Sequence, residues 1–271
     1  KAYNCFDQAI KLDPDFAEPY RNKYLVSRQL CDFERAVECE PELDRLMADD
    51  PFISITRSED LEKNLEVAQR WSSELAANIP KNIFTYAHRE KSNKIHIGYL
   101  SHDFRTHPMG MMTAPIFKLH DRKKFIVSAY SYGPDDLSTY RERVKNDADH
   151  FVDMKEMGIS DSAKRIHDDG VDILVDLTGY TESHRLEIMA MRPARIRMTW
   201  LGFPGGLGAD FVDYIIADRT IIPETSEKWF HEKVLILPHC YQINDSELPL
   251  VQKNISREDV GLAKDMFVFA S

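Results

Sequence analysis

One short segment of the sequence combines a carboxylate with two imidazoles. Between Ser101 and Gly110 it contains His102, Asp103 and His107. These groups can serve as a general base, a proton shuttle or hydrogen-bonding partners for a sugar. The same residues also fit a polar loop in which Asp103 caps the next helix. A metal centre is disfavoured, because no third and fourth ligand stand at a familiar spacing.

Two glycine-bearing segments, residues 179–181 and 201–208, could bring the backbone close to a ligand. Glycine has no Cβ atom, so its amide can approach an N-acetyl group or a phosphate. On glycine density alone, a flexible turn is the favoured explanation of the same glycines. Neither the dinucleotide fingerprint nor the P-loop pattern occurs in the sequence, so those two functions have no support.

Three further histidines, His150, His184 and His239, stand singly near the ends of expected strands. A lone histidine is more often a hydrogen-bonded or surface residue than a catalytic one, because catalysis requires partners that orient the ring. These three positions therefore carry no functional assignment from local sequence alone.

The elements that would position these residues follow from hydrophobic periodicity. From about Lys94, short β-rich runs alternate with amphipathic segments. The expected strands are residues 95–101, 125–132, 150–154, 172–177, 196–201, 214–217 and 234–237. Connections such as residues 137–148, 161–169 and 183–191 are long enough to hold a helix. This alternation predicts a parallel sheet with helices on both faces, whose ligand site lies at the carboxyl ends of the strands.

The first part of the chain has helical periodicity instead. A proline follows one amphipathic helix and precedes the next, in the pattern of a 34-residue tetratricopeptide (TPR) repeat. We therefore expect residues 1–48 to be the end of a TPR array with its helical adaptor, and residues 49–93 to be a helical linker. The helical pattern breaks at residues 49–52 and resumes over residues 59–77. One and a half repeats are too few to be stable alone, so the array is expected to continue beyond this chain.

Composition argues against several classes of function. The formal net charge of −10 disfavours binding to a nucleic-acid backbone. No apolar stretch approaches the roughly 18 residues that a membrane span requires. The four cysteines form no C-x-x-C pair, which fits a reduced cytosol. We expect a cytoplasmic protein that binds neither nucleic acid nor membrane.

Ordered motifs from residue 97 to residue 218 resemble the protein O-GlcNAc transferase family. They are IGYLSHDF (97–104) with His107 and Pro108, DHFVD (149–153), RIHDDGVDILVDL (165–177), GYT (179–181), MRPA (191–194), WLGFPG (200–205) with Gly208, and DYIIAD (213–218). The adaptor around residues 30–33 and 51–52 is more similar to bacterial, SPINDLY-like members than to animal ones.

The resemblance implies a GT-B glycosyltransferase. Residues 94–271 would be its first Rossmann-like lobe, with residues 267–271 starting a second lobe that is otherwise missing. The activity implied is inverting transfer of N-acetylglucosamine from UDP-N-acetylglucosamine to Ser or Thr hydroxyls of proteins, with no cofactor and no metal. The nucleotide sugar would be one partner, and protein acceptors held through the TPR array the other.

The resemblance also assigns residues to the site. Asp103 and His107 would be catalytic, His107 as an active-site contact first and a base second. The residues implied to bind substrate are His150, Tyr180, Thr181, Leu201, Gly202, Phe203 and Pro204. Leucine and glycine at 201 and 202 would help to wall the N-acetyl pocket.

Two departures from the family pattern affect these expectations. Animal members carry a His-His pair in the adaptor, where this sequence has Pro51 and Phe52. The family's lysine and histidine that grip the pyrophosphate would lie beyond Ser271, so this chain alone is expected to be inactive. The alternatives are the same architecture with another sugar, such as fucose, and a non-catalytic TPR scaffold. A metal-dependent phosphoesterase lacks the ligand spacing.

Overall fold

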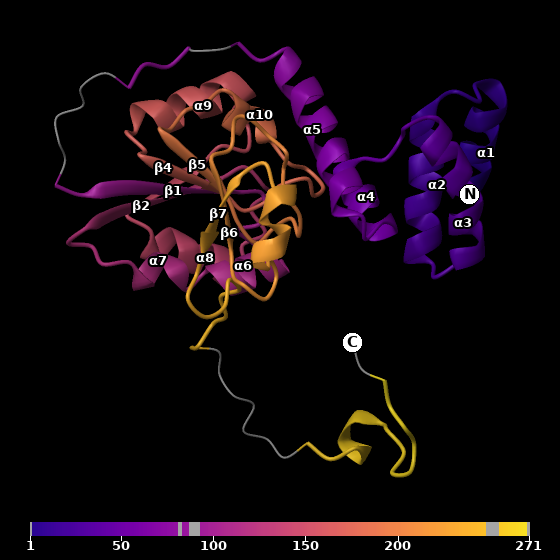
Figure 1. Cartoon of the computed structure of the whole chain (residues 1–271). Helices are drawn as coiled ribbons and strands as arrows, with labels where there is room; N and C mark the ends of the chain where they lie inside the picture. Colours follow the sequence, from indigo (N-terminus) through magenta and orange to yellow (C-terminus); the bar gives the residue numbers. More distant parts are fainter. Residues whose placement is uncertain (1, 81–82, 87–92, 248–254, 270–271) are drawn as a thin grey trace.

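The computed structural model describes residues 2–80, 83–86, 93–247 and 255–269 (Figure 1). It starts with three helices that pack side by side: α1 (Ala2–Leu12), α2 (Ala17–Gln29) and α3 (Phe33–Arg45). Tyr24 of α2 and Leu43 of α3 are buried in a small core of their own. Asp32 begins α3 as its N-cap, where its side chain accepts the backbone N–H of Arg35. We call α1–α3 the helical tail.

A fourth helix, α4 (Pro51–Arg57), occupies the place where the sequence predicted a break. The Asp50 side chain caps it by accepting the N–H of Ile53 at 2.7 Å. Proline at the first helical position loses no intrahelical hydrogen bond and has a suitable φ, so Pro51 starts a helix. The expectation of a non-helical break through residue 58 was therefore wrong. The next helix, α5 (Leu61–Ala77), matches the predicted segment.

The described residues after α5 contain a parallel sheet of seven strands in the order β3-β2-β1-β4-β5-β6-β7. The strands are β1 (Ile95–Ser101), β2 (Phe125–Ser131), β3 (His150–Asp153), β4 (Ile173–Asp176), β5 (Ile196–Thr199), β6 (Tyr214–Ala217) and β7 (Lys233–Ile236). Every neighbouring pair is parallel. All seven predicted strands are confirmed, each within a residue or two of the expected bounds.

Helices cover both faces of this sheet, as the alternating pattern predicted (Figure 1). One face packs against α6 (Pro108–Thr113), α7 (Ile116–Leu119) and α8 (Thr139–Asp147). The other packs against α9 (Ile159–Asp168), α10 (Leu186–Ala190) and α5. Two short 3-10 helices, η1 (Glu224–Trp229) and η2 (Glu258–Val260), follow β6 and β7. Strands buried on both faces need apolar runs, and this explains why the sheet was visible in the sequence.

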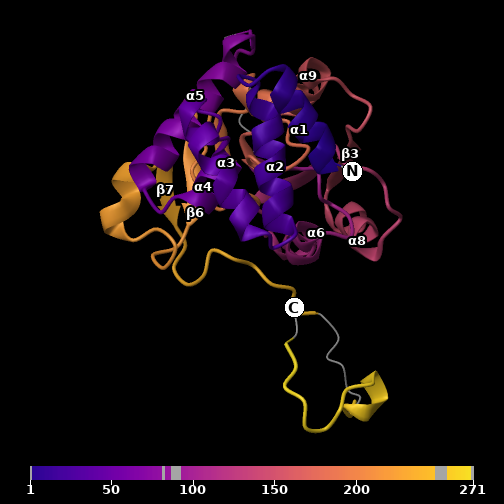
Figure 2. The ribbon, with the colours of Figure 1, turned by 90° about the vertical axis from the view of Figure 1, so that its right-hand side faces the viewer.

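Helix α5 is part of the lobe rather than a free linker. Ala68 is buried in the same core as β1 and β4. The Ser72 hydroxyl donates to the carbonyl of Gly208 at 2.7 Å. A Cβ atom on Gly208 would lie 2.6 Å from the backbone nitrogen of Gln69, so only glycine permits this approach. The helical tail stands apart from the sheet in Figure 1, and in the view turned by 90° it lies in front of the lobe (Figure 2).

The expectation that residues 267–271 start a second lobe stays a prediction. Residues 267–269 are not in a strand, and residues 270–271 lie outside the described residues. Over the described ranges, no helix is both long and apolar enough to cross a membrane.

Candidate active site

A cavity of about 280 Å³ lies where β1, β4 and β5 end. Four of the predicted site residues line it: Asp103 and His107 after β1, Thr181 after β4, and Gly202 after β5. The carboxyl ends of parallel strands meet at one rim, so loops that are distant in sequence come together there. We call this space the Asp103 cavity.

The Asp103 carboxylate is buried and lies close to three side-chain nitrogens. Its Oδ1 atom lies 2.9 Å from Nδ1 of His102 and accepts from Nη2 of Arg105 at 3.1 Å. Its Oδ2 atom lies 3.7 Å from Nδ1 of His107. A buried carboxylate requires such partners, because desolvation penalises an unpaired charge. Asp103 therefore holds the surrounding side chains in place as well as lining the cavity.

His107 is the N-cap of α6, with extended backbone and a side chain that turns back to the helix. Its Nδ1 atom accepts the backbone N–H of Met109 at 3.2 Å. A ring nitrogen that accepts an N–H carries no proton, so the neutral imidazole has its proton on Nε2. The ring is about one third exposed, at 36%. His107 in this state offers a hydrogen-bond donor to the cavity rather than a base.

The loop after β4 turns sharply at Gly179, whose φ is +58°. A Cβ atom there would lie 2.3 Å from Cβ of Phe203. Tyr180 is buried and donates its hydroxyl to the carbonyl of Leu207 at 2.9 Å. Thr181 reaches the Asp103 cavity, whereas Tyr180 faces a second cavity on the other side of the loop.

The side chain of Asp176 stabilises this turn through a hydrogen bond. It ends β4, is 2% exposed, and accepts the N–H of Gly179 at 2.7 Å. Burial raises the pKa of Asp176 to about 7. This residue was not among the predicted site residues. Its one signal in the sequence is a carboxylate at the end of an apolar strand, where an unpaired charge is costly.

The loop after β5 is divided between two spaces. Gly202 lines the Asp103 cavity, and a Cβ atom on it would lie 2.0 Å from the carbonyl oxygen of Leu177. Leu201, Phe203 and Pro204 instead line a smaller cavity of about 110 Å³ toward β6. The structure therefore brings Gly202, but not its three neighbours, to Asp103.

His150 lies away from the Asp103 cavity. It is the first residue of β3 and is exposed, with its ring 6.2 Å from the ring of His96 near the start of β1. The amino end of a parallel strand points away from the rim where the carboxyl ends meet. The motif around His150 identified the strand correctly, but the structure does not bring this residue to the other predicted site residues.

Some lining residues were not predicted. They are His102, Arg105, Met109, Leu177, Glu182 and Ser183. The first two lie in the quoted loop motif, so an Asp flanked by cationic or imidazole groups was an available signal. Glu182 and Ser183 follow Thr181, and only the bend of the loop brings them to the cavity.

A second, larger cavity of about 670 Å³ lies between the helical tail and the lobe. Residues of α2, including Leu25 and Gln29, form one side, and Trp71 of α5 forms part of another. The loop of residues 180–184 closes it, and three of those residues also line the Asp103 cavity. We call this space the tail cavity. The two cavities are therefore neighbours that share one wall.

The histidine of the shared loop favours its neutral form. Burial lowers the pKa of His184, which lines the tail cavity. In the part of the chain that the structure describes, no cluster of three or more His, Cys, Asp or Glu side chains is suited to hold a metal ion.

Comparison with known proteins gives a consistent set of relatives. Glycosyl transferase family 41 matches residues 44–261. A probable UDP-N-acetylglucosamine–peptide N-acetylglucosaminyltransferase of Arabidopsis thaliana is 32% identical over 262 residues, which are 90% of this chain and 26% of that protein. The corresponding transferase of Caenorhabditis elegans is 37% identical over 157 residues, which are 58% of this chain and 14% of that protein.

The structural comparison agrees. A mutant O-GlcNAc transferase of Thermobaculum terrenum superposes with a TM-score of 0.70 at 25% identity. The match covers 89% of this chain and 48% of that one. The chain therefore spans about half of the solved structure and about a quarter of the Arabidopsis protein.

Proposed function

Because the chain belongs to glycosyl transferase family 41, we propose that it forms the first lobe and adjoining helices of a protein O-GlcNAc transferase. The reaction would transfer N-acetylglucosamine from UDP-N-acetylglucosamine to Ser or Thr hydroxyls of proteins. The observation that carries this proposal is the shared wall between the Asp103 cavity and the tail cavity. A transferase that modifies proteins needs a small site for the sugar beside a long site for the acceptor.

The chemistry expected at the Asp103 cavity is substitution at the anomeric carbon. The acceptor oxygen forms the new bond and releases its hydroxyl proton to solvent, the bond between the anomeric carbon and UDP breaks, and the pyrophosphate oxygen takes the electron pair. Reactants held about 3 to 3.5 Å apart in the correct orientation gain most of the rate advantage. In this proposal the Nε2–H of His107 donates to the sugar or to the departing oxygen, and Asp103 fixes the loop that carries it.

We also propose that the helical tail is the end of a TPR array that presents acceptor proteins. Its helices pack as hairpins, and α2 turns Leu25 and Gln29 toward the tail cavity. An extended acceptor segment in that cavity would pass the loop of residues 180–184 on its way to the Asp103 cavity. The support for this is the position of the cavity and the helical repeat pattern in the sequence.

A GT-B enzyme binds its substrates between two lobes, and the resemblance implies that the second lobe binds most of the nucleotide. Residues 1–271 alone are therefore expected to bind UDP weakly and to transfer no sugar. Calorimetry with millimolar UDP tests this, with the full-length protein that carries this chain as the control. Micromolar affinity for residues 1–271 would place the nucleotide site in this lobe and overturn the division.

The activity itself is tested with the full-length protein and a library of Ser- and Thr-containing peptides. UDP-N-acetylglucosamine and a nucleotide-activated fucose are offered separately, and mass spectrometry identifies any sugar added. The proposal requires a peptide mass increase from the first donor. Transfer from fucose alone would preserve the architecture and change the donor. No transfer from either donor would favour the scaffold alternative.

A further inference from the structure

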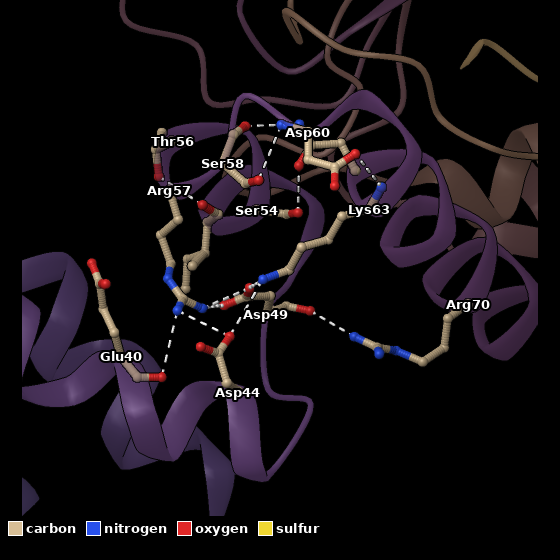
Figure 3. A network of polar contacts seen from close by, with 12 residues as sticks. Glu40, Asp44, Asp49, Ser54, Thr56, Arg57, Ser58, Asp60, Lys63 and Arg70 are labelled. Carbon is tan, nitrogen blue, oxygen red and sulfur yellow. Dashed lines mark hydrogen bonds and ion pairs between the residues drawn. The ribbon is translucent and has the colours of Figure 1, made fainter. Parts of the chain in front are cut away.

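The helical tail meets the lobe at a buried ion pair (Figure 3). Asp49 lies between α3 and α4, and Arg57 ends α4. The Nη1 atom of Arg57 donates to both carboxylate oxygens of Asp49, at 2.5 and 2.7 Å. Each side chain is only 6% exposed. We call Asp49 and Arg57 the tail joint.

The tail joint connects four helices. On the tail side, Nη2 of Arg57 donates to the side chain of Asp44 at 3.1 Å, and the guanidinium lies 5.9 Å from the ring of Tyr24. On the lobe side, the carbonyl of Asp49 accepts from Nη2 of Arg70 at 2.9 Å and from Nε1 of Trp71 at 3.0 Å. The polar contacts run from α3 through α4 to α5 (Figure 3), and the contact with Tyr24 adds α2.

The same helices form the walls of the tail cavity. Gln29 of α2 and Glu182 of the lobe both line it. Helix α5 is fixed on the lobe through the Ser72 hydroxyl and the tight contact at Gly208. The tail joint therefore lies between helix α5, which is fixed on the lobe, and helix α2, which forms another wall of the tail cavity.

A buried ion pair is suited to fixing an angle. Its net contribution to stability is small, because desolvation opposes the attraction between the charges. Its geometry is constrained, because the planar guanidinium of Arg57 donates through one nitrogen to Asp49 and through another to Asp44. An apolar contact of the same size would tolerate sliding. The position of this pair between tail and lobe thus points to orientation rather than stability.

We propose that Asp49 and Arg57 are positioning residues that hold the helical tail at the angle required for an acceptor protein to enter the tail cavity. The part of this proposal that concerns entry of an acceptor protein rests on the proposed function. The geometric part, that the ion pair fixes the width of the cavity, stands on the contacts alone. Two experiments separate these parts.

The first experiment measures the width directly. The exposed cysteines, Cys5, Cys31 and Cys240, are first replaced by Ser. Spin labels are then placed on Gln29→Cys in the tail and on Glu182→Cys in the lobe, two positions that line the tail cavity.

Double electron–electron resonance should give a narrow distribution of the distance between the two labels with the native joint and a broad one with Arg57→Met. Lys63→Met is the matched control, because Lys63 lies at the exposed edge of the same network, 4.0 Å from Asp49.

A double variant distinguishes orientation from simple damage. Arg57→Met leaves the Asp49 charge buried without its partner, which destabilises the fold. Asp49→Asn with Arg57→Met removes both charges and should recover thermal stability. The distance distribution should nevertheless stay broad. A narrow distribution in either variant would overturn the proposal.

The second experiment uses the full-length enzyme. Arg57→Met should raise the KM for a protein acceptor about tenfold and leave kcat within about twofold, as expected when only acceptor binding is lost. UDP affinity should not change, and Lys63→Met should behave as the parent. Equal losses in acceptor and UDP binding would contradict a positioning role. If the parent transfers no sugar, the proposed function fails. The distance measurement still tests whether the tail joint fixes the width of the tail cavity.

Discussion

The Oδ2 atom of Asp103 lies 3.7 Å from Nδ1 of His107, and that nitrogen already accepts the N–H of Met109. The imidazole is thus held through Nδ1 by the start of α6, and His107 lines the Asp103 cavity. This arrangement fixes which nitrogen can contact a substrate. It also separates two roles of His107, capping a helix and contacting the reactants.

Replacing His107 in two ways tests that separation. Asparagine can still accept the Met109 N–H, so His107→Asn should keep the stability of the lobe, whereas His107→Ala should lose about 1 kcal/mol. Both should reduce transfer by the full-length enzyme about 100-fold, because both lose a donor aimed at the reacting groups. Thermal unfolding and a transfer assay give the two readouts. Unchanged transfer by His107→Ala would remove this residue from the reaction centre.

Asp103→Asn keeps the size of the side chain and removes its charge. Because Asp103 orients His102 and Arg105, transfer should fall about 100-fold through lost positioning, while UDP affinity changes by less than about threefold. Transfer kinetics and UDP calorimetry on the full-length enzyme measure the two effects. Comparable losses in both would assign Asp103 to nucleotide binding or to folding.

Gly202→Ala should be strongly destabilising. The added methyl group would meet the carbonyl oxygen of Leu177 at 2.0 Å, and backbone must move to relieve the clash. We expect a loss of about 3 kcal/mol in the free energy of unfolding. Gly158→Ala is the matched control, since a methyl group at that position would meet no atom within 4 Å and the φ of Gly158 is −67°. That change should cost less than about 1 kcal/mol. Similar denaturation curves for the two variants would refute the packing argument.

Asp176→Asn should alter how stability depends on pH. Burial raises the pKa of Asp176 to about 7, above the value of about 3.9 in an unfolded chain. Between these values the folded state keeps a proton that the unfolded state has released. The contribution of Asp176 to the free energy of unfolding is therefore fully present below about pH 4 and is lost as the pH rises toward 7.

Asparagine cannot ionise, and its side-chain oxygen can still accept the Gly179 N–H. The free energy of unfolding of Asp176→Asn should therefore exceed that of the parent by a margin that grows with pH, by at most about 1.4 kcal/mol per pH unit. Chemical denaturation at several pH values between 5 and 8 gives this difference. A margin that stays constant over that range would show that Asp176 is ionised throughout.

Much of the fold could be predicted from the sequence. Strands such as β4 (Ile173–Asp176) are apolar runs, because both faces of a covered parallel sheet are buried. The start of α4 could not be predicted, since Pro51 is equally compatible with ending one helix and beginning the next. Tertiary packing decides that Pro51 begins a helix, because Ile53 of that helix is fully buried in the core of the helical tail.

The candidate site could be predicted only in part, because a sequence motif does not show at which end of a strand a residue lies. A motif shows that Asp103 and His150 occur on the same lobe, but the direction of a strand decides which end each residue occupies. Asp103 follows its strand and reaches the rim, whereas His150 begins its strand. Likewise, Leu201 and Gly202 are adjacent in sequence, yet a positive φ of 66° at Leu201 lets them line different spaces.

The close contact between Gly208 and α5 has a consequence for exchanging helical tails between related enzymes. The strands begin at residue 95, which makes that region look like a natural joining point. A graft joined there would strip α5 away and uncover the apolar surface around Ala68. A graft joined between the end of α3 and Asp49 would keep α4, α5 and the tail joint together. The transferable unit of this lobe thus begins two helices before its first strand.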